Sequence, residues 1–279
     1  MPTSLCQLAT LRFAFLGGGN MATAMITGLI ACGVPARQIR VVAPSSSTRQ
    51  RLRETFGVST QTAPNSDFGH SDVLVLAVKP QQLQAAVRDL LPHMMGGLIV
   101  SLVAGVRMGT LQRLFNSSRV VRAMPNTPAL LGQGMTGLTA PVELDAADRA
   151  VASALATAMG QCLWVEGDEQ LNAVTALSGS GPAYLFYLIE AMEHAALALG
   201  LSAEQERQLA VSTFHGAALL ASQSAEATCL LRERVTSTGG TTQAAIQVLD
   251  THCVQQTFVQ AIQAAASRSQ EISAELGFC

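Results

Sequence analysis

The sequence predicts an α/β protein in which an N-terminal, doubly wound parallel sheet is followed by an all-helical C-terminal region. Two observations lead to this prediction. Short apolar and β-branched runs alternate with amphipathic stretches as far as about residue 165, and a glycine-rich turn follows the first of these runs. Beyond about residue 167 the chain is rich in Ala, Gln and Leu, with helical periodicity and almost no strand-like stretch. We therefore expect two domains, 1–165 and 166–279.

The predicted strands and helices of the N-terminal domain alternate along the chain. The run at 72–78 is almost unbroken in its apolar character, which is typical of a strand covered on both faces. Such alternation predicts parallel strands joined by right-handed crossovers. The predicted strands are 12–16, 39–43, 72–78, 98–103, 119–124, 135–139 and 162–165, and the predicted helices are 20–32, 48–56, 81–91, 110–115 and 145–159.

The C-terminal domain is predicted to contain helices at 169–199, 203–222, 240–250 and 253–275. Pro182 lies inside the first of them and should kink or interrupt it. The preceding segment, Ser178–Gly181, lacks the G-x-S-x-G spacing of a nucleophile elbow. Its small residues favour close helix packing, with space for a substrate as the alternative.

The chain is unusually apolar, with 49% hydrophobic residues and a mean hydropathy of +0.31. No apolar stretch approaches the roughly 18 residues that a membrane-spanning helix needs, so we expect no membrane association. Buried strands, and helices that bury more than one face, account better for the excess of apolar residues. The composition therefore favours self-association.

Charge and metal-binding residues exclude several classes of function. The net charge is −2 and no basic run is present, so nucleic acid is not an expected partner. The six cysteines are scattered without a CxxC pair, and the five histidines lack metal-ligand spacing, so we expect reduced thiols and no metal site. The N-terminus lacks the basic region and apolar core of a secretory signal, which predicts a cytoplasmic protein.

The glycine-rich turn reads Gly17-x-Gly19-x-x-Ala22 between the first predicted strand and helix. The first glycine permits a tight turn, the second lets the backbone approach a pyrophosphate, and the small third residue allows the helix to pack on the strand. The start of the helix adds amide donors and a positive dipole. The turn therefore predicts a Rossmann-type dinucleotide site, with an ordinary strand–helix turn as the alternative.

The end of the second strand indicates which dinucleotide is bound. NAD enzymes usually carry an acidic residue there for the ribose hydroxyls, whereas residues 43–49 contain four hydroxyl side chains, Arg49 and no acid. Ser45 and Arg49 suit a 2′-phosphate, so NADPH is favoured, with NADH as a weaker alternative. The same run could also serve simply as the N-cap of the following helix.

Further candidate residues follow the next strands, at the sheet edge where ligands of such folds bind. Lys79, the only lysine in the chain, and Pro80 follow the 72–78 run. Small residues at 101–105 leave room for a cofactor. Two prolines hold the loop around Asn126, whose amide could face the nicotinamide, unless the segment is merely a well-made turn.

Five segments, taken together and in this order, resemble the pyrroline-5-carboxylate reductase family. The resemblance implies reduction of L-1-pyrroline-5-carboxylate to L-proline, the last step of proline biosynthesis. It also implies that 1–165 is an NADP(H)-binding domain and that 166–279 is an oligomerisation and substrate domain, which forms a homodimer or a homodecamer. The segments are FLGGGNMA at 15–22, AVKPQ at 77–81, RAMPNTP at 122–128, TALSGSGPAY at 175–184 and VTSTGGTT at 235–242.

The resemblance also assigns site residues. Thr238 stands where the family usually has a proline, which puts the rigidity of the substrate loop at 234–242 in question. Asp168 or Glu166 aligns with an acidic residue near the substrate. The implied cofactor contacts are Leu16, Gly17, Gly18, Gly19, Asn20, Met21, Ser45, Asn65, Ala77, Val78, Lys79, Pro80, Leu102, Val103 and Ala104, and the expected substrate residues are Arg234, Ser237, Gly240, Thr241, Thr242 and Asp168.

The expected chemistry needs mainly positioning from the protein. Successive amides at Gly240, Thr241 and Thr242, where a helix begins, form a natural site for the substrate carboxylate. The Thr242 hydroxyl is expected to hydrogen-bond the imine nitrogen, which makes Thr242 the candidate catalytic residue.

Three other functions are alternatives to this expectation. A β-hydroxyacid dehydrogenase would place a catalytic lysine on the long second-domain helix, but 169–199 contains none. A reductase of another small cyclic imine, and a non-catalytic NADP(H)-sensing protein, remain open.

Overall fold

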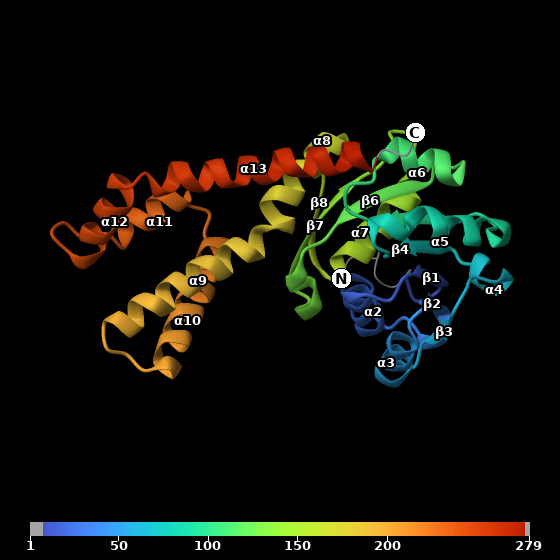
Figure 1. Ribbon diagram of the computed structural model, residues 1–279, viewed down its shortest axis with the longest axis horizontal. Coiled ribbons are helices and arrows are strands. Elements are labelled where there is room, and N and C mark those ends of the chain that lie inside the picture. The colour runs from blue at the N-terminus through green and yellow to red at the C-terminus, as the bar shows by residue number, and fades with distance from the viewer. Residues whose placement is uncertain (1–7, 277–279) are drawn as a thin grey trace. The chain divides into compact units, whose positions relative to one another are not determined.

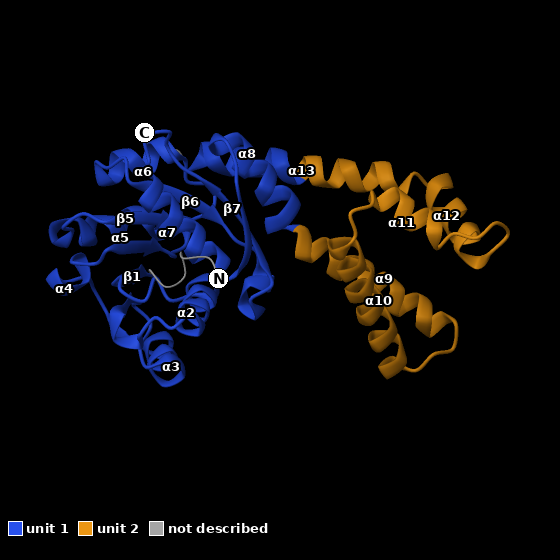
Figure 2. Cartoon of the chain, turned by 180° about the vertical axis from the view of Figure 1, so that it is seen from behind, with its two compact units in different colours: residues 1–180, 265–279 blue, residues 181–264 orange. Residues whose placement is uncertain are grey.

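The computed structural model describes residues 8–276. The segment 1–7, which carries most of the stretch expected to lack a secretory signal, lies outside the described residues. The chain forms two compact units, coloured separately in Figure 2. Unit 1 comprises 1–180 together with 265–279, and unit 2 comprises 181–264.

Unit 1 is built around one eight-stranded sheet with the order β3-β2-β1-β4-β5-β6-β7-β8 (Figure 1). The strands that flank β1 and continue to β6 are all parallel, which confirms the predicted doubly wound sheet. The strands are β1 (Phe13–Leu16), β2 (Ile39–Val42), β3 (Ser59–Gln61), β4 (Val73–Leu76), β5 (Leu98–Ser101), β6 (Val120–Met124), β7 (Gly134–Thr139) and β8 (Gly160–Trp164).

One feature of the sheet differs from the prediction of parallel strands throughout. β7 runs antiparallel to β6, and β8 is again parallel to β7. The connection from β6 to β7 contains only a short 3₁₀ helix, Thr127–Leu131. A chain that returns without a helical crossover can only pair antiparallel, so the reversal follows from the length of this connection.

Helices cover both faces of the sheet, as the alternation of side chains along β1 shows. Phe13 and Phe15 belong to a core cluster shared with α2 and α7, whereas Ala14 and Leu16 belong to a second cluster shared with α5 and α6. Burying each large side chain contributes roughly 1.5–3 kcal/mol. The helices of unit 1 are α2 (Asn20–Ala31), α3 (Ser46–Phe56), α4 (Ser66–Gly69), α5 (Leu83–Leu90), α6 (Met108–Phe115), α7 (Ala146–Thr157) and α8 (Gly167–Val174).

The long helix predicted at 169–199 is interrupted, as the presence of Pro182 led us to expect. α8 gives way to a π-helical turn, Thr175–Gly179, before α9 begins at Gly181. The Ser180 amide donates to the Thr175 carbonyl at 2.9 Å, which closes the wider turn.

Unit 2 consists of helices. The bounds of these helices agree with the predicted ones, except for α11, which the sequence did not indicate. Among its described residues only Ala196 and Ala210 are buried. Large apolar side chains are instead exposed, including Phe186 (59%), Tyr187 (72%) and Leu199 (82%). So much exposed apolar surface marks a face for association with another surface. The helices are α9 (Gly181–Ala198), α10 (Ala203–Gln223), α11 (Thr228–Arg234), α12 (Thr241–Thr251) and the first half of α13 (Val254–Glu275).

Candidate functional site

The glycine turn after β1 has two glycines with different physical requirements. Gly17 has φ +107°, and a side chain there would overlap the carbonyl oxygen of Ala77 on the neighbouring strand end. Gly19, the N-cap of α2, has φ −75° and no atom within 4 Å of the position that a Cβ would take. Gly19 has no side chain with which to cap the amides of α2. The turn therefore leaves open space at an uncapped helix start, which fits a pyrophosphate.

An arginine from the next helix holds this turn in place. Arg51 in α3 donates from Nη2 to the Gly18 carbonyl at 3.2 Å, and its two terminal nitrogens also lie 3.3 and 3.2 Å from the Thr23 hydroxyl. Gly18 itself packs against α3, because a Cβ there would lie 2.8 Å from Leu52 Cδ1. Sequence reasoning missed Arg51, since nothing local links it to a glycine 33 residues earlier.

The serine-rich end of β2 combines the two roles that the sequence suggested. Ser45 caps α3 by accepting the Thr48 amide at 3.3 Å and lies 2.8 Å from the Ser47 hydroxyl. Arg49 donates from Nη1 to the carbonyls of Ala43 and Pro44, both at 2.6 Å. These bonds hold the guanidinium at the carboxyl end of β2, beside exposed hydroxyls and without an acidic neighbour in the run.

Other candidate residues gather at the same edge of the sheet. The Ala77 amide donates to Leu16 O and the Leu102 amide to Leu76 O, so the ends of β1, β4 and β5 are in register. Lys79 begins the 3₁₀ turn Pro80–Gln82 with an exposed side chain. Asn65 caps the short helix α4 by accepting the Phe68 amide at 3.0 Å. The segments after β1, β2, β4 and β5 thus form one carboxyl edge.

Asn126, which was expected to face a nicotinamide, has its amide group turned towards protein partners. Its nitrogen donates to the carbonyl and the hydroxyl of Ser178, both at 3.2 Å. Its oxygen accepts the Met135 amide at 2.9 Å. The side chain therefore joins three segments of unit 1, which sequence spacing did not reveal.

Asp168 also has partners within unit 1. Both of its oxygens accept the Met108 amide, at 3.2 and 3.1 Å, so it caps α6 from another element. It also forms an ion pair with Arg122, whose side chain is buried in β6. A buried arginine without a counter-ion would be strongly destabilising, so these contacts give Asp168 a structural role of its own. Glu166 is the N-cap residue of α8, and its amide donates to Gln170 Oε1 at 2.9 Å.

The expected substrate loop lies in unit 2, immediately before α12. Gly239 has φ +75°, a conformation that favours glycine, and a side chain at Gly240 would overlap the Ser237 hydroxyl. The Gly239 amide donates to Gln243 Oε1 at 2.6 Å, which ties the loop to the first turn of the helix. Gly240, the N-cap residue of α12, has no side chain with which to cap the helix, and its own amide donates to the Ser237 carbonyl at 3.0 Å.

The remaining residues of the loop differ in exposure. Arg234 pairs with Glu226 at 2.5 Å and is largely exposed. Ser237, Thr238 and Thr241 are exposed, whereas Thr242 is half-buried. Thr236 adds two further bonds at the start of the loop, because its hydroxyl and its amide donate to the carbonyls of Arg232 and Glu233 at 2.7 and 3.0 Å.

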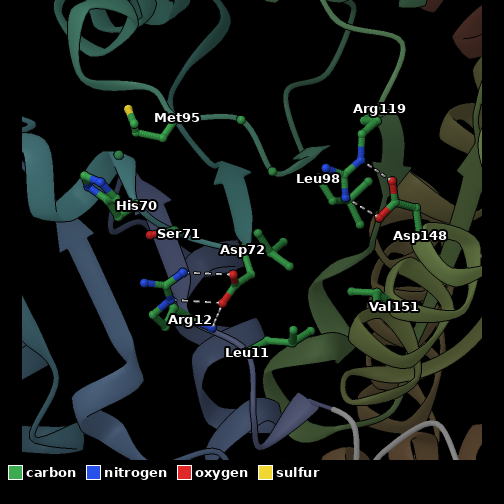
Figure 3. Close-up of a pocket in the computed structure, with 14 residues that line it drawn as sticks. Leu11, Arg12, His70, Ser71, Asp72, Met95, Leu98, Arg119, Asp148 and Val151 are labelled. Carbon is green, nitrogen blue, oxygen red and sulfur yellow. Dashed lines mark hydrogen bonds and ion pairs between the residues drawn. The ribbon is translucent and has the colours of Figure 1, made fainter.

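The amino ends of the strands, at the opposite edge of the sheet, border a hollow of about 460 Å³ (Figure 3). Two bidentate ion pairs line it: Arg12 with Asp72 at 3.0 Å, and Arg119 with Asp148 at 2.7 Å. Hydrogen bonding to Arg12 holds the pKa of Asp72 below its ordinary value. Because ligands of such sheets bind at the carboxyl edge, we assign these pairs to the stability of the sheet.

Replacing Asp72 with Asn should lower thermal stability slightly at neutral pH, by on the order of 1–2 °C in Tm, because the pair is partly exposed. A carboxylate whose folded pKa is depressed stabilises the fold above its unfolded pKa, and this contribution is lost as pH falls through the folded value. The Tm difference should therefore close in acid. Asp89→Asn, at an exposed position of α5, is the control, and an equal effect of both variants at every pH would contradict the assignment.

The Rossmann-type sheet and the open glycine turn at its carboxyl edge define a dinucleotide-dependent oxidoreductase. Residues 12–105 match the family model described as NADP oxidoreductase, coenzyme F420-dependent, and residues 168–272 match the model for pyrroline-5-carboxylate reductase dimerisation. The chain belongs to the pyrroline-5-carboxylate reductase family.

Full-length relatives establish this membership. The chain is 43% identical to the pyrroline-5-carboxylate reductase of Pseudomonas aeruginosa, over 97% of this chain and 100% of that protein. It is 36% identical to the enzyme of that name from Arabidopsis thaliana, over 94% of this chain and 95% of that one. A solved pyrroline-5-carboxylate reductase from Coxiella burnetii, 37% identical, superposes with a TM-score of 0.88 and covers 95% of this chain and 99% of its own.

More distant similarity extends to the fold alone. The crystal structure of a Plasmodium falciparum pyrroline carboxylate reductase, which has NADP bound, shares 24% identity and a TM-score of 0.84 over 95% of this chain and 99% of that one.

Within residues 8–276, no helix is both long and apolar enough to cross a membrane, and no three His, Cys, Asp or Glu side chains are grouped as a metal site. Self-association is indicated by the matched dimerisation model and by the exposed apolar helices of unit 2.

Proposed function

We propose that this chain reduces L-1-pyrroline-5-carboxylate to L-proline with NADPH, the last step of proline biosynthesis. The observation that carries the proposal is full-length membership of a family whose curated members bear this activity in their name. The uncapped starts of α2 and α12 supply the two kinds of anion site that the reaction requires, one for a pyrophosphate and one for a carboxylate.

The residues at the carboxyl edge of unit 1 fit a dinucleotide. Gly19 leaves space against the amides of Asn20 and Met21, and Gly17 allows the strand ends to approach one another. Ser45 and Arg49 would bind the 2′-phosphate, and the backbone at 77–80 and 102–104 would hold the nicotinamide half. When bound, the nicotinamide supplies the hydride. This set of cofactor residues is proposed as a whole, together with Asn65.

The loop before α12 would bind the substrate. The amides of Thr241 and Thr242 begin α12 without a side-chain cap and can donate to the substrate carboxylate. The Gly240 amide, which was expected to join them, instead donates to the Ser237 carbonyl. Within the described residues the Thr242 hydroxyl has no protein partner, so it is available to hydrogen-bond the imine nitrogen. Protonation of that nitrogen from solvent makes the C=N carbon electrophilic, so the chain need only orient the ring and need not supply a strong acid.

We also propose that the two predicted domains have different functions. Residues 1–165 would bind NADPH, and residues 166–279 would bind substrate and assemble a homodimer or a homodecamer. The finer assembly is proposed from the family resemblance and from the exposed apolar side chains of α9–α12. We place the protein in the cytoplasm, where the dinucleotide is available.

The decisive experiment is a spectrophotometric assay of the purified full-length chain. Oxidation of NADPH should follow addition of pyrroline-5-carboxylate and should not follow addition of hydroxyacids or keto acids. NADH should support a slower rate. Turnover only with another cyclic imine would indicate the nearest alternative substrate, and NADPH binding without any turnover would indicate a sensing protein. Either result would overturn the proposal.

Two neighbouring arginines should separate the parts of the cofactor site. Arg49→Ala should raise the KM for NADPH about 10-fold and leave that for NADH almost unchanged, because it removes the cation proposed for the 2′-phosphate. Arg51→Ala should raise both KM values together, because Arg51 holds the Gly18 carbonyl of the shared pyrophosphate turn. Arg53→Ala, which loses only a bond to Thr60, is the control. Equal effects of Arg49→Ala on both cofactors would refute the 2′-phosphate role.

A further inference from the structure

The π-helical turn Thr175–Gly179 leaves one backbone carbonyl in need of a donor. In a continuous α-helix the carbonyl of residue 178 accepts the amide of residue 182. Here residue 182 is a proline, which has no N–H to donate. Ser178 is half-buried, and a backbone carbonyl shielded from water without a partner is costly.

The side chain of Asn126 supplies the donor that Pro182 lacks. Its Nδ2 lies 3.2 Å from the Ser178 carbonyl oxygen and 3.2 Å from the Ser178 hydroxyl. Its Oδ1 accepts the Met135 amide at 2.9 Å, which fixes the orientation of the group. The amide therefore bonds three protein atoms, which ties the turn to the ends of β6 and β7.

The turn is also packed directly on the end of β6. A Cβ on Gly179 would lie 2.8 Å from Met124 Cε, so the absence of a side chain allows this approach. β6 pairs in register with β5, through Ser101 opposite Arg122. The segment 102–104, which we propose to contact the nicotinamide half of the cofactor, leaves β5 at this same edge. The Ser178 turn thus borders the proposed reaction site within unit 1.

We infer that Asn126 is a positioning residue: its amide substitutes for the donor missing at Pro182 and holds the Ser178 turn against the carboxyl edge of the sheet. This inference rests on the proposed function for its catalytic consequence. Asn126 then acts on the reaction through Ser178 and Gly179, without contacting the substrate itself.

Asn126→Asp is the primary test, because it keeps the shape of the side chain and still accepts the Met135 amide. The ionised carboxylate cannot donate to the Ser178 carbonyl and repels it. We expect kcat with pyrroline-5-carboxylate to fall about 10-fold or more while the Kd for NADPH changes by less than about 2-fold, since small displacements near reacting groups are costly to rate. Asn116→Asp makes the same charge change at the exposed end of α6 and should match the wild type.

Hydrogen exchange measures the structural step independently of turnover. Amides of the peptide 174–181 should exchange faster in Asn126→Asp than in the wild type or in Asn116→Asp. Pro182→Ala restores an N–H that can reach the Ser178 carbonyl, so Asn126→Asp should cost less kcat in that background than in the wild type. Should Asn126→Asp fail to fold, Ser178→Ala removes one of the two contacts and is expected to lower kcat about 2- to 5-fold.

The failures of the two proposals are distinguishable. A wild-type chain that does not turn over pyrroline-5-carboxylate overturns the proposed function, and the exchange measurement still tests the role of Asn126. An active wild type, with Asn126→Asp equal to Asn116→Asp in both kcat and exchange, overturns the positioning role. The positioning role is also overturned if the effects of Asn126→Asp and Pro182→Ala on kcat are strictly additive.

Discussion

Gly19→Ala is expected to raise the Kd for NADPH about 30-fold or more, equivalent to about 2 kcal/mol of binding free energy, without weakening the fold. Gly19 has an ordinary φ of −75° and no protein atom within 4 Å of an added Cβ. The new methyl group therefore meets nothing in the free protein and occupies the space proposed for the pyrophosphate. Fluorescence titration with NADPH, together with a thermal melt, measures both quantities.

Gly17→Ala is the matched contrast two residues away. There the added Cβ would overlap the Ala77 carbonyl, and φ is +107°. We expect a loss of about 3 kcal/mol in the free energy of unfolding, which corresponds to a fall of roughly 6–12 °C in Tm. A Gly19→Ala protein that binds NADPH as tightly as the wild type would remove the pyrophosphate from this turn.

The contrast between the two glycines illustrates what a sequence can and cannot reveal. The turn itself was predictable, because its requirements are local: a strand, a tight turn and a helix start within about ten residues. The reason for Gly17 was not, since the clash involves Ala77, a residue on another strand. The parallel strands β1, β2, β4, β5 and β6 were predictable for the same local reason, namely the alternation of strand and helix.

The elements that were missed depend on distant or weak signals. Arg51 contacts a glycine 33 residues away, and Asn126 contacts a serine 52 residues away, so neither pairing leaves a periodic trace. The antiparallel β7 follows from a connection without a helix, which the strand pattern alone did not indicate. β3 and α11 are short, and β3 is polar, so neither carries the hydrophobic periodicity on which the predictions relied.

The candidate site was predicted unevenly for a related reason. Backbone sites, such as the starts of α2 and α12, are encoded by glycines before a helical segment, which are visible in the sequence. Sites made of side chains depend on contacts with residues that are distant in the sequence. Asp168 was expected from the family resemblance to lie near the substrate, whereas in unit 1 it caps α6 and balances the buried Arg122. Any contact of Asp168 with the substrate would have to form in addition to these two structural contacts.

Thr242→Ala is expected to lower kcat/KM for pyrroline-5-carboxylate by about 10- to 100-fold, the usual cost of removing a hydrogen bond to a charged group. The amide of residue 242 remains in this variant, so part of the carboxylate site survives. The Kd for NADPH should stay within about 2-fold, because that site lies in residues 1–165. Steady-state kinetics and NADPH titration separate the two effects.

The conservative and control variants decide whether the hydroxyl itself is responsible. Thr242→Ser keeps the hydroxyl and should recover most of the rate. A low rate in Thr242→Ser would instead indicate that the reaction needs the methyl group of Thr242. Thr251→Ala removes a threonine hydroxyl at the far end of α12, where it bonds only the Gln247 carbonyl, and should leave the kinetics unchanged. A normal kcat/KM in Thr242→Ala would remove this residue from the reaction. The substrate would then be oriented by the amides of Thr241 and Thr242 alone.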